Sequence, residues 1–247
     1  MSEETTDTVI DEPVPIKLTI GIATIPKRMF DDRFLPRIVN KLLFQIGDRK
    51  DVELIILGDN KKITVGKKRD RLIQMAQGEF VVLIDDDDDV SEDYIKTVCN
   101  IIEKNPNIDV ISHAQKAIID GDEWIVDFSL AHDRTPPLEQ LSHWYQDGFV
   151  DDPENPGTQI WKANGVIGGK RICKRPPFPV CPFRTELAKQ VRFIDFNSAE
   201  DVCWARKMWD LCKKEYKTNK QLHIYIWNPN VSELPLMNPE GAKEVTE

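Results

Sequence analysis

Five consecutive carboxylates in the middle of the chain have the clearest capacity for chemistry. Asp85–Asp89 directly follows Phe80–Ile84, an apolar run rich in β-branched residues that is typical of a buried strand. Burying five adjacent carboxylates, or pleating them along a strand, would cost too much repulsion and desolvation. We therefore expect the strand to end near Ile84 and to be followed by an acidic turn.

Such a turn suits metal binding. Clustered carboxylate oxygens favour a hard divalent cation such as Mg²⁺ or Mn²⁺, which in turn favours phosphate. In open α/β sheets, ligands bind at the carboxyl ends of the strands, where this turn is expected. The alternative is a surface turn that caps the next helix, since Ser91, Glu92 and Asp93 are already typical of a helix start.

The segments around the turn alternate between strand and helix patterns. The expected strands are 16–23, 51–57, 80–84 and 108–112, and the expected helices are 31–46, 66–77 and 91–105. Gly78 is expected to end the second helix as a residue tolerant of positive φ. The alternation predicts an α/β fold, with a mostly parallel sheet flanked by helices.

The pattern changes after residue 112. Further expected elements are a hairpin of 115–119 and 123–128, a short helix 138–146, a loop 147–158, a strand 160–165, helices 184–191 and 198–213 (the latter capped by Ser198), and a last strand 223–227. We interpret 16–112 and 113–228 as two halves of one domain, the second being smaller. A flexible acidic leader, 1–15, precedes the domain and a tail, 229–247, follows it.

Composition excludes several classes of protein. The net charge of −9 over 247 residues argues against a protein that coats nucleic acid. No signal peptide and no apolar run long enough for a membrane span is found. The five cysteines have no metal-ligand spacing, so we expect reduced thiols and a cytoplasmic location.

Polar residues follow each of the first three expected strands. Thr24, Asp59 and the Asp85 turn should meet at one edge of the sheet, because the carboxyl ends of parallel strands converge there. Basic residues lie between them in the sequence: Lys27, Arg28, Lys67, Lys68 and Arg69. A bound diphosphate needs both kinds of group: carboxylates hold a cation on its oxygens, and basic side chains neutralise the remaining charge.

These motifs together resemble a known family. Gly66–Asp70, Ala76–Phe80, Leu83–Asp88 and Glu92–Asp93, followed by Phe183–Leu187, Phe193–Asp195 and Ala199–Asp201, are similar in order and spacing to the motifs of the family 2 inverting glycosyltransferases, which have the GT-A (Rossmann-like) fold. The resemblance covers roughly residues 17–213. Two departures stand out: Asp70 lies where the family usually has Asn, and the Q-x-x-R-W segment of processive synthases is missing, so the resemblance implies a non-processive enzyme.

The resemblance implies a role for each matching residue. Thr24 would lie near the nucleotide, Asp59 would accept from the nucleobase, and Arg69 would support the base or diphosphate. Metal ligands would be Asp85, Asp87 and, in reserve, Asp88, with Asp86 near the ribose; the register of this triplet within Asp85–Asp89 stays open. Asp201 would be the general base, with Glu200 beside it, although both carboxylates could instead serve only the dipole of their helix.

The implied reaction is a single displacement on a nucleoside-diphosphate sugar, with a UDP-sugar favoured as donor and Mn²⁺ or Mg²⁺ as cofactor. The acceptor hydroxyl stays open: saccharide, lipid, protein or, as a minor alternative, a modified nucleic-acid base. Lys170 and Arg171, in the basic segment 168–175, would bind an anionic ligand unless this segment is a solvated loop.

Two other functions compete with transfer. A sugar-phosphate nucleotidyltransferase also needs carboxylate-held Mg²⁺, but it should have a glycine-rich loop after its first strand, and Ala23–Arg28 lacks glycine. A non-catalytic module with the same fold could use the turn to bind a metal or a nucleotide. His223, which begins the last expected strand, is a candidate further metal ligand, although a packed histidine is the more common case.

Overall fold

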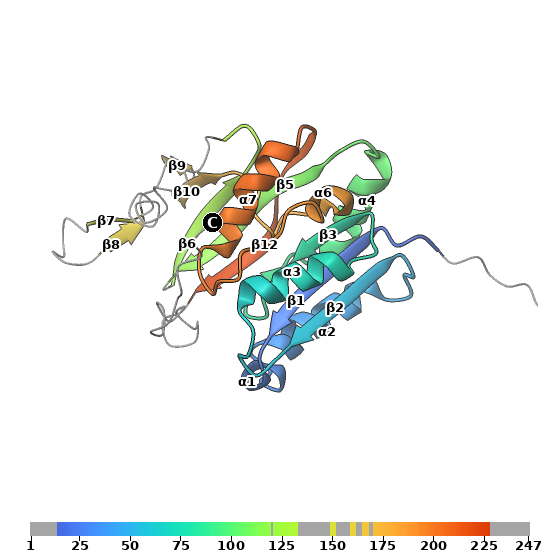
Figure 1. Ribbon diagram of the computed structural model, residues 1–247. Helices are drawn as coiled ribbons and strands as arrows, with labels where there is room; N and C mark the ends of the chain where they lie inside the picture. The colour runs from blue at the N-terminus through green and yellow to red at the C-terminus, as the bar shows by residue number, and fades with distance from the viewer. Residues whose placement is uncertain are drawn as a thin grey trace, which may run out of the picture.

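The computed structural model describes residues 14–119, 121–132, 149–151, 159–161, 165–167 and 170–227. The strands are β1 (Leu18–Thr24), β2 (Val52–Gly58), β3 (Phe80–Leu83), β4 (Asp89–Val90), β5 (Val110–Ile119), β6 (Asp122–Phe128), β7 (Phe149–Asp151), β8 (Gln159–Trp161), β9 (Gly165–Ile167), β10 (Lys170–Arg175), β11 (Phe183–Arg184) and β12 (Glu215–Trp227). The helices are α1 (Pro26–Met29), α2 (Leu35–Ile46), α3 (Val65–Met75), α4 (Tyr94–Lys104), α6 (Thr185–Ala188) and α7 (Glu200–Leu211). Figure 1 shows how they are arranged.

The main strands of the central sheet run in one direction. β1 pairs in parallel with β2 and β3, and β12 pairs in parallel with β5. The short β11 lies antiparallel between β3 and β5, so β5 runs the same way as β3. The carboxyl ends of β1, β2, β3, β5 and β12 therefore lie at one edge. This confirms the expected mixed α/β fold with a mostly parallel central sheet, and the antiparallel pair of β5 and β6 confirms the hairpin.

Helices cover both faces of this sheet (Figure 1). α2 and α4 pack on one face, against β1 and β3, through a core that includes Ile38, Leu42 and Val98. α3, α6 and α7 pack on the other face, where Trp204 is fully buried. The Trp204 ring stacks on Phe193 and meets Phe183 edge-on, both at 5.0 Å between centroids, so α7 is fixed against the sheet by aromatic packing.

Several boundaries differ from the expectations. Residues 108–112 and 115–119 were expected as separate strands, but β5 is continuous from Val110 to Ile119. The last strand begins at Glu215 rather than His223, with register shifts between Lys217 and His223. α2 begins at Leu35 rather than residue 31, α6 has four residues, and the segment after β1 forms the short helix α1 rather than a loop.

The start of α7 corrects a predicted cap. Ser198 was expected to cap the helix, but the N-cap is Ala199, with φ +61° and no side-chain hydrogen bond, and the helix begins at Glu200. Gly78 is also explained differently: it lacks positive φ, and α3 has already ended at Met75. A Cβ at Gly78 would lie 2.6 Å from the Thr19 nitrogen, so glycine is required there for the close approach to β1.

The remaining expectations are tested in part. The five cysteines are free and buried, in agreement with reduced thiols.

The expected loop 147–158 contains the strand β7, and Lys170–Arg175 forms β10, so the loop alternative for these residues is wrong. The expected helix 138–146, the tail 229–247 and all but the end of the leader 1–15 lie outside the described residues. No helix of the described part is long and apolar enough to cross a membrane.

Candidate functional site

The acidic turn after β3 is held at the carboxyl edge of the sheet. The backbone N–H of Asp88 donates to the Asp85 carbonyl at 3.2 Å, which closes the turn. Arg37 of α2 donates to the carbonyl oxygens of Asp87 and Asp88 at 3.0 and 2.8 Å. The capping alternative is wrong for these carboxylates, because β4 separates them from α4, whose N-cap residue is Asp93.

Asp86 joins the turn to the end of β1. Its buried carboxylate accepts from the Thr24 hydroxyl at 2.7 Å and from Arg28 at 2.6 Å. Burial outweighs both contacts and raises the pKa of Asp86 above its ordinary value. Arg28 also lies 3.0 Å from Asp87, so one guanidinium from α1 bridges two members of the turn. Thr24, Asp86 and the basic residue Arg28 of α1 are thus brought together, as expected.

Asp59, at the end of β2, is already well supplied with partners. It accepts from the backbone N–H groups of Lys62 and Ile63 at 2.5 and 2.9 Å and forms an ion pair with Lys68. Although burial opposes it, these contacts lower the pKa of Asp59. The Lys68 ammonium donates in addition to the Thr24 carbonyl at 2.9 Å, so the ends of β1 and β2 are tied together.

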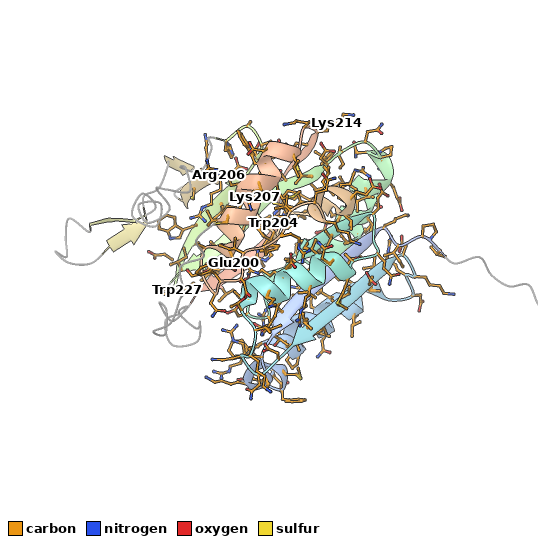
Figure 2. The ribbon with its side chains drawn as sticks, viewed as in Figure 1. Glu200, Trp204, Arg206, Lys207, Lys214 and Trp227 are labelled. Carbon is orange, nitrogen blue, oxygen red and sulfur yellow. The ribbon has the colours of Figure 1, made fainter. Side chains whose placement is uncertain are left out.

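Arg69 of α3 connects the acidic turn to the start of α7. It donates to both Asp85 carboxylate oxygens at 2.7 and 2.8 Å and to Glu200 at 2.5 Å. The pKa of Asp85 is lowered despite burial, because the Arg69 charge outweighs desolvation. Burial raises the pKa of Glu200 to about 7, against the attraction of Arg69. Figure 2 shows Glu200 at the first turn of α7, on the side of Trp227 at the end of β12.

Two adjoining cavities open around these residues. The larger, of about 480 Å³, is lined by Thr24, Arg28, Lys68, Asp86, Asp87 and Glu200, among others. The smaller, of about 240 Å³, is lined by Asp88, Asp201 and mostly apolar residues. Arg69, Asp85 and Tyr225 line both. We name the larger one the donor cavity and the smaller one the acceptor cavity, after the roles that we propose for them below.

Negative charge accumulates where the cavities adjoin. Burial and the charges of Asp88 and Asp85 raise the pKa of Asp87 to about 7, and Arg28 offsets this only in part. Burial also raises the pKa of Asp88, whose carboxylate accepts from the Ile226 N–H at 3.1 Å and lies 3.3 Å from Nε2 of the buried His223. This excess of carboxylates would be relieved by a cation.

The structure separates the remaining predicted residues. Asp201 lies in the first turn of α7, accepts from the Val202 N–H at 2.8 Å and faces the acceptor cavity, apart from Glu200 in the donor cavity. Lys170 and Arg171 belong to β10, and their side chains lie outside what is described, so their role stays a prediction. Asp70 is paired with Arg192 at 2.7 Å, which explains a carboxylate at this position.

Sequence reasoning missed Tyr225. This half-buried residue lines both cavities. Burial and the nearby charges of Asp88, Asp87 and Asp85 raise the pKa of its phenol, which therefore keeps its proton. The alternation of His223–Trp227 indicated a strand. Tyr225 lies two residues after the candidate ligand His223, on the same face of that strand, and could have been chosen for this reason.

Comparison with known proteins finds a matching family model and a group of solved structures with a similar fold. Residues 38–148 match the model described as glycosyl transferase family 2. No curated protein matches the chain in sequence. Crystal structures of S. aureus TarS share the fold: full-length TarS at 16% identity, with 87% of this chain and 37% of that chain covered and a TM-score of 0.51.

The shorter TarS 1–349 in complex with UDP-GlcNAc is similar at 15% identity, with 89% of this chain and 62% of that chain covered and a TM-score of 0.52. TarS 1–349 in complex with UDP matches at 16% identity, 87% and 61% coverage, and a TM-score of 0.51. The chain thus spans between about a third and two thirds of these TarS chains. The fold resemblance agrees with the GT-A architecture implied by the sequence motifs.

Proposed function

We propose that the protein is a metal-dependent, inverting, non-processive glycosyltransferase that uses a nucleoside-diphosphate sugar, with UDP as the favoured carrier. One observation carries this proposal: the donor and acceptor cavities meet at Arg69, Asp85 and Tyr225, with Asp201 on the acceptor side. The family 2 match and the UDP and UDP-GlcNAc complexes of the similar TarS fold support it.

The residues present fit a divalent cation by charge. Burial and the charges of neighbouring carboxylates raise the pKa values of Asp87 and Asp88, and Arg28 and His223 offset this only in part. Among the described residues, no group of three or more His, Cys, Asp or Glu side chains is arranged to hold a metal by itself. Protein carboxylates commonly hold Mg²⁺ or Mn²⁺ together with substrate phosphates. Asp87 and Asp85 would hold the cation, with Asp88 in reserve.

The chain's own residues account for the rest of the reaction. Lys68 and Arg28 border the donor cavity and would attract the diphosphate. Thr24, which also lines this cavity, and Asp59, which is paired with Lys68, would bind the nucleoside. Bound at the turn, the cation would neutralise charge on the departing diphosphate. Asp201 would take the proton of the acceptor hydroxyl as its oxygen attacks the anomeric carbon from the side opposite the diphosphate.

A donor screen tests the proposal. The protein is incubated with UDP-, GDP- and TDP-sugars in the presence of Mn²⁺, and released nucleoside diphosphate is measured with and without EDTA. We expect release from one donor class, most strongly from a UDP-sugar, and its loss with EDTA. Release of pyrophosphate from a sugar phosphate and a nucleoside triphosphate would instead identify a nucleotidyltransferase, and nucleotide binding without turnover would identify a binding module.

A further inference from the structure

The acceptor cavity is lined by more apolar than polar residues, and several of the apolar ones are aromatic. It lies between β5, β6 and β10 on one side and the start of α7 with the segment 178–180 on the other. Its apolar lining residues are Leu83, Ala117, Ile119, Trp124, Val126, Phe128, Cys173, Phe178, Pro179, Val180 and Val202. Trp124, Phe128 and Phe178 are themselves buried, so aromatic surface faces the cavity.

Eight of the described residues that line the cavity are polar or charged. A saccharide carries a hydroxyl on nearly every carbon, and each polar group that is buried without a partner costs about 1–3 kcal/mol. Among the described residues, Arg69, the acidic turn, Asp201 and β12 supply six of these polar groups, and Gln115 and Arg175 supply the other two. Gln115 is 7% exposed, and its amide has no hydrogen-bond partner among the described residues. Away from the acidic turn, Arg69, Asp201 and β12, the described lining is therefore apolar except for Gln115 and Arg175.

The volume of the cavity limits what can enter. A cavity of about 150 Å³ lined by apolar side chains binds benzene. At about 240 Å³, the acceptor cavity is suited to one substituted six-membered ring or a small bicyclic ring, but not to a disaccharide. Phe128 and Phe178 lie 6.0 Å apart at a tilt, a geometry in which aromatic rings add specific contact energy.

We propose that the acceptor is a hydroxyl or hydroxymethyl group carried on a planar aromatic or heteroaromatic ring, which inserts into the acceptor cavity. The inference rests on the proposed transferase function and specifies its substrate class. The ring lies against the aromatic lining residues, and its polar edge faces Gln115 and Arg175. Its hydroxyl oxygen forms the new bond to the anomeric carbon, the bond from that carbon to the diphosphate breaks, and the hydroxyl proton goes to Asp201.

A binding experiment tests the inference separately from turnover. The probe is 4-nitrobenzyl alcohol, whose nitroaromatic ring quenches tryptophan fluorescence, and the comparison ligand is methyl glucoside. We expect saturable quenching by the probe, at least tenfold tighter than any binding of methyl glucoside measured by calorimetry. Ala117→Phe should fill the cavity and weaken probe binding at least tenfold. Equal affinities, or no saturable quenching in the wild-type protein, would overturn the inference.

Matched variants keep the result interpretable. Val126→Phe fills the cavity from β6, whereas Ile125→Phe changes the neighbouring residue, whose side chain points to the other face of the strand and lines neither cavity. Binding of UDP with Mn²⁺ and circular dichroism show whether each variant is folded. Unchanged probe binding in a folded Ala117→Phe or Val126→Phe protein would overturn the inference, whereas the donor screen alone decides whether transfer occurs.

Discussion

At the scale of single residues, the two candidate catalytic carboxylates have separable roles. Asp87 faces the donor cavity and Asp201 the acceptor cavity. We expect Asp87→Asn to weaken Mn²⁺-dependent UDP binding about tenfold or more, a loss of ~1.4 kcal/mol, because a cation ligand is lost. Asp201→Asn should leave that binding unchanged and abolish transfer. Calorimetry of UDP binding and a transfer assay check both.

The contrast between these variants is the control. Both substitutions remove one negative charge and keep the size of the side chain, so a general electrostatic effect would act on both alike. If Asp201→Asn also lost UDP binding, its assignment as the general base would be wrong.

Tyr225 is the residue for which the structure suggests a role that the sequence did not. Its protonated phenol lies among carboxylates at the boundary of the two cavities. We expect Tyr225→Phe to lower kcat about tenfold or more with a smaller change in KM. The reason is that a hydrogen bond from the phenol to charge that develops during the reaction stabilises mainly the transition state. Steady-state kinetics measures this. Tyr216→Phe, at a half-buried position outside both cavities, should leave kcat unchanged; an equal fall there would point to a structural effect.

Which residues could be found from the sequence follows from how they are placed. Thr24, Asp59 and Asp85 lie at the ends of their strands or within two residues of them, so strand prediction alone brings them to one edge. Tyr225 and Gln115 reach the site through the pairing of β12 with β5, more than 100 positions apart in the chain. No local pattern encodes that pairing, and so these residues were missed.

At the scale of elements, the contact of α3 with the segment before α7 sets the position of α7. The Gly66 N–H donates to the Phe196 carbonyl at 3.0 Å, and Thr64 donates to Asp195 at 2.5 Å. A Cβ at Gly66 would lie 2.0 Å from the Ile194 carbonyl oxygen, which is backbone and cannot rotate away. Glycine at this position therefore allows α3 to approach closely enough for Arg69 to reach Glu200.

Gly66→Ala tests this contact. We expect the free energy of unfolding to fall by about 1–3 kcal/mol, as for other overpacked sites, and transfer activity to fall further because Arg69 and Glu200 are displaced. Urea denaturation measures the first effect. Gly58→Ala is the control, since its Cβ would come closest to the flexible end of Met29, at 2.8 Å, and should cost less stability. A stable, fully active Gly66→Ala protein would show that the contact is not required.

Element boundaries were predicted where periodicity is strong and missed where tertiary pairing decides. The apolar stripe of α4 and the continuous apolar residues of β3 predicted the ends of both elements nearly correctly. The first half of β12, Glu215–Gln221, is largely polar, and it is a strand because β5 supplies its hydrogen-bond partners. Ser198 has the chemistry of an N-cap, but the turn of α7 onto α3 places Ala199 there instead.

At the scale of the whole molecule, one continuous sheet joins the two halves that the sequence suggested. β12 returns from the end of the described chain to lie beside β5 and also pairs with β4, directly after the acidic turn. His223 and Tyr225 on β12 thereby face carboxylates supplied by the first half. Donor and acceptor cavities are therefore parts of a single packed unit, whose stability should respond as a whole to changes in its centre.

His113 on β5 offers a measure of that stability. It is fully buried, with its ring nitrogens 2.9 and 3.1 Å from the carbonyl oxygens of Ala114 and Val180, and it contacts Phe128 edge-on at 5.8 Å. Burial lowers the pKa of His113 to about 4, against its backbone contacts, and the charges of His223 and Lys217 act in the same direction. In the unfolded chain this pKa is about 6.5.

The unfolded chain therefore binds more protons at this residue between pH 6.5 and 4, and the His113 contribution to the free energy of unfolding falls as pH falls through that range. The full loss is about 3 kcal/mol for a shift of this size. In His113→Phe, which keeps a ring against Phe128, this pH-dependent term should vanish, although the variant is less stable at neutral pH. Urea denaturation of both proteins at pH 5 and 7.5 gives the difference: the stability gap should narrow at pH 5, and a gap independent of pH would mean that folding does not lower the pKa of His113.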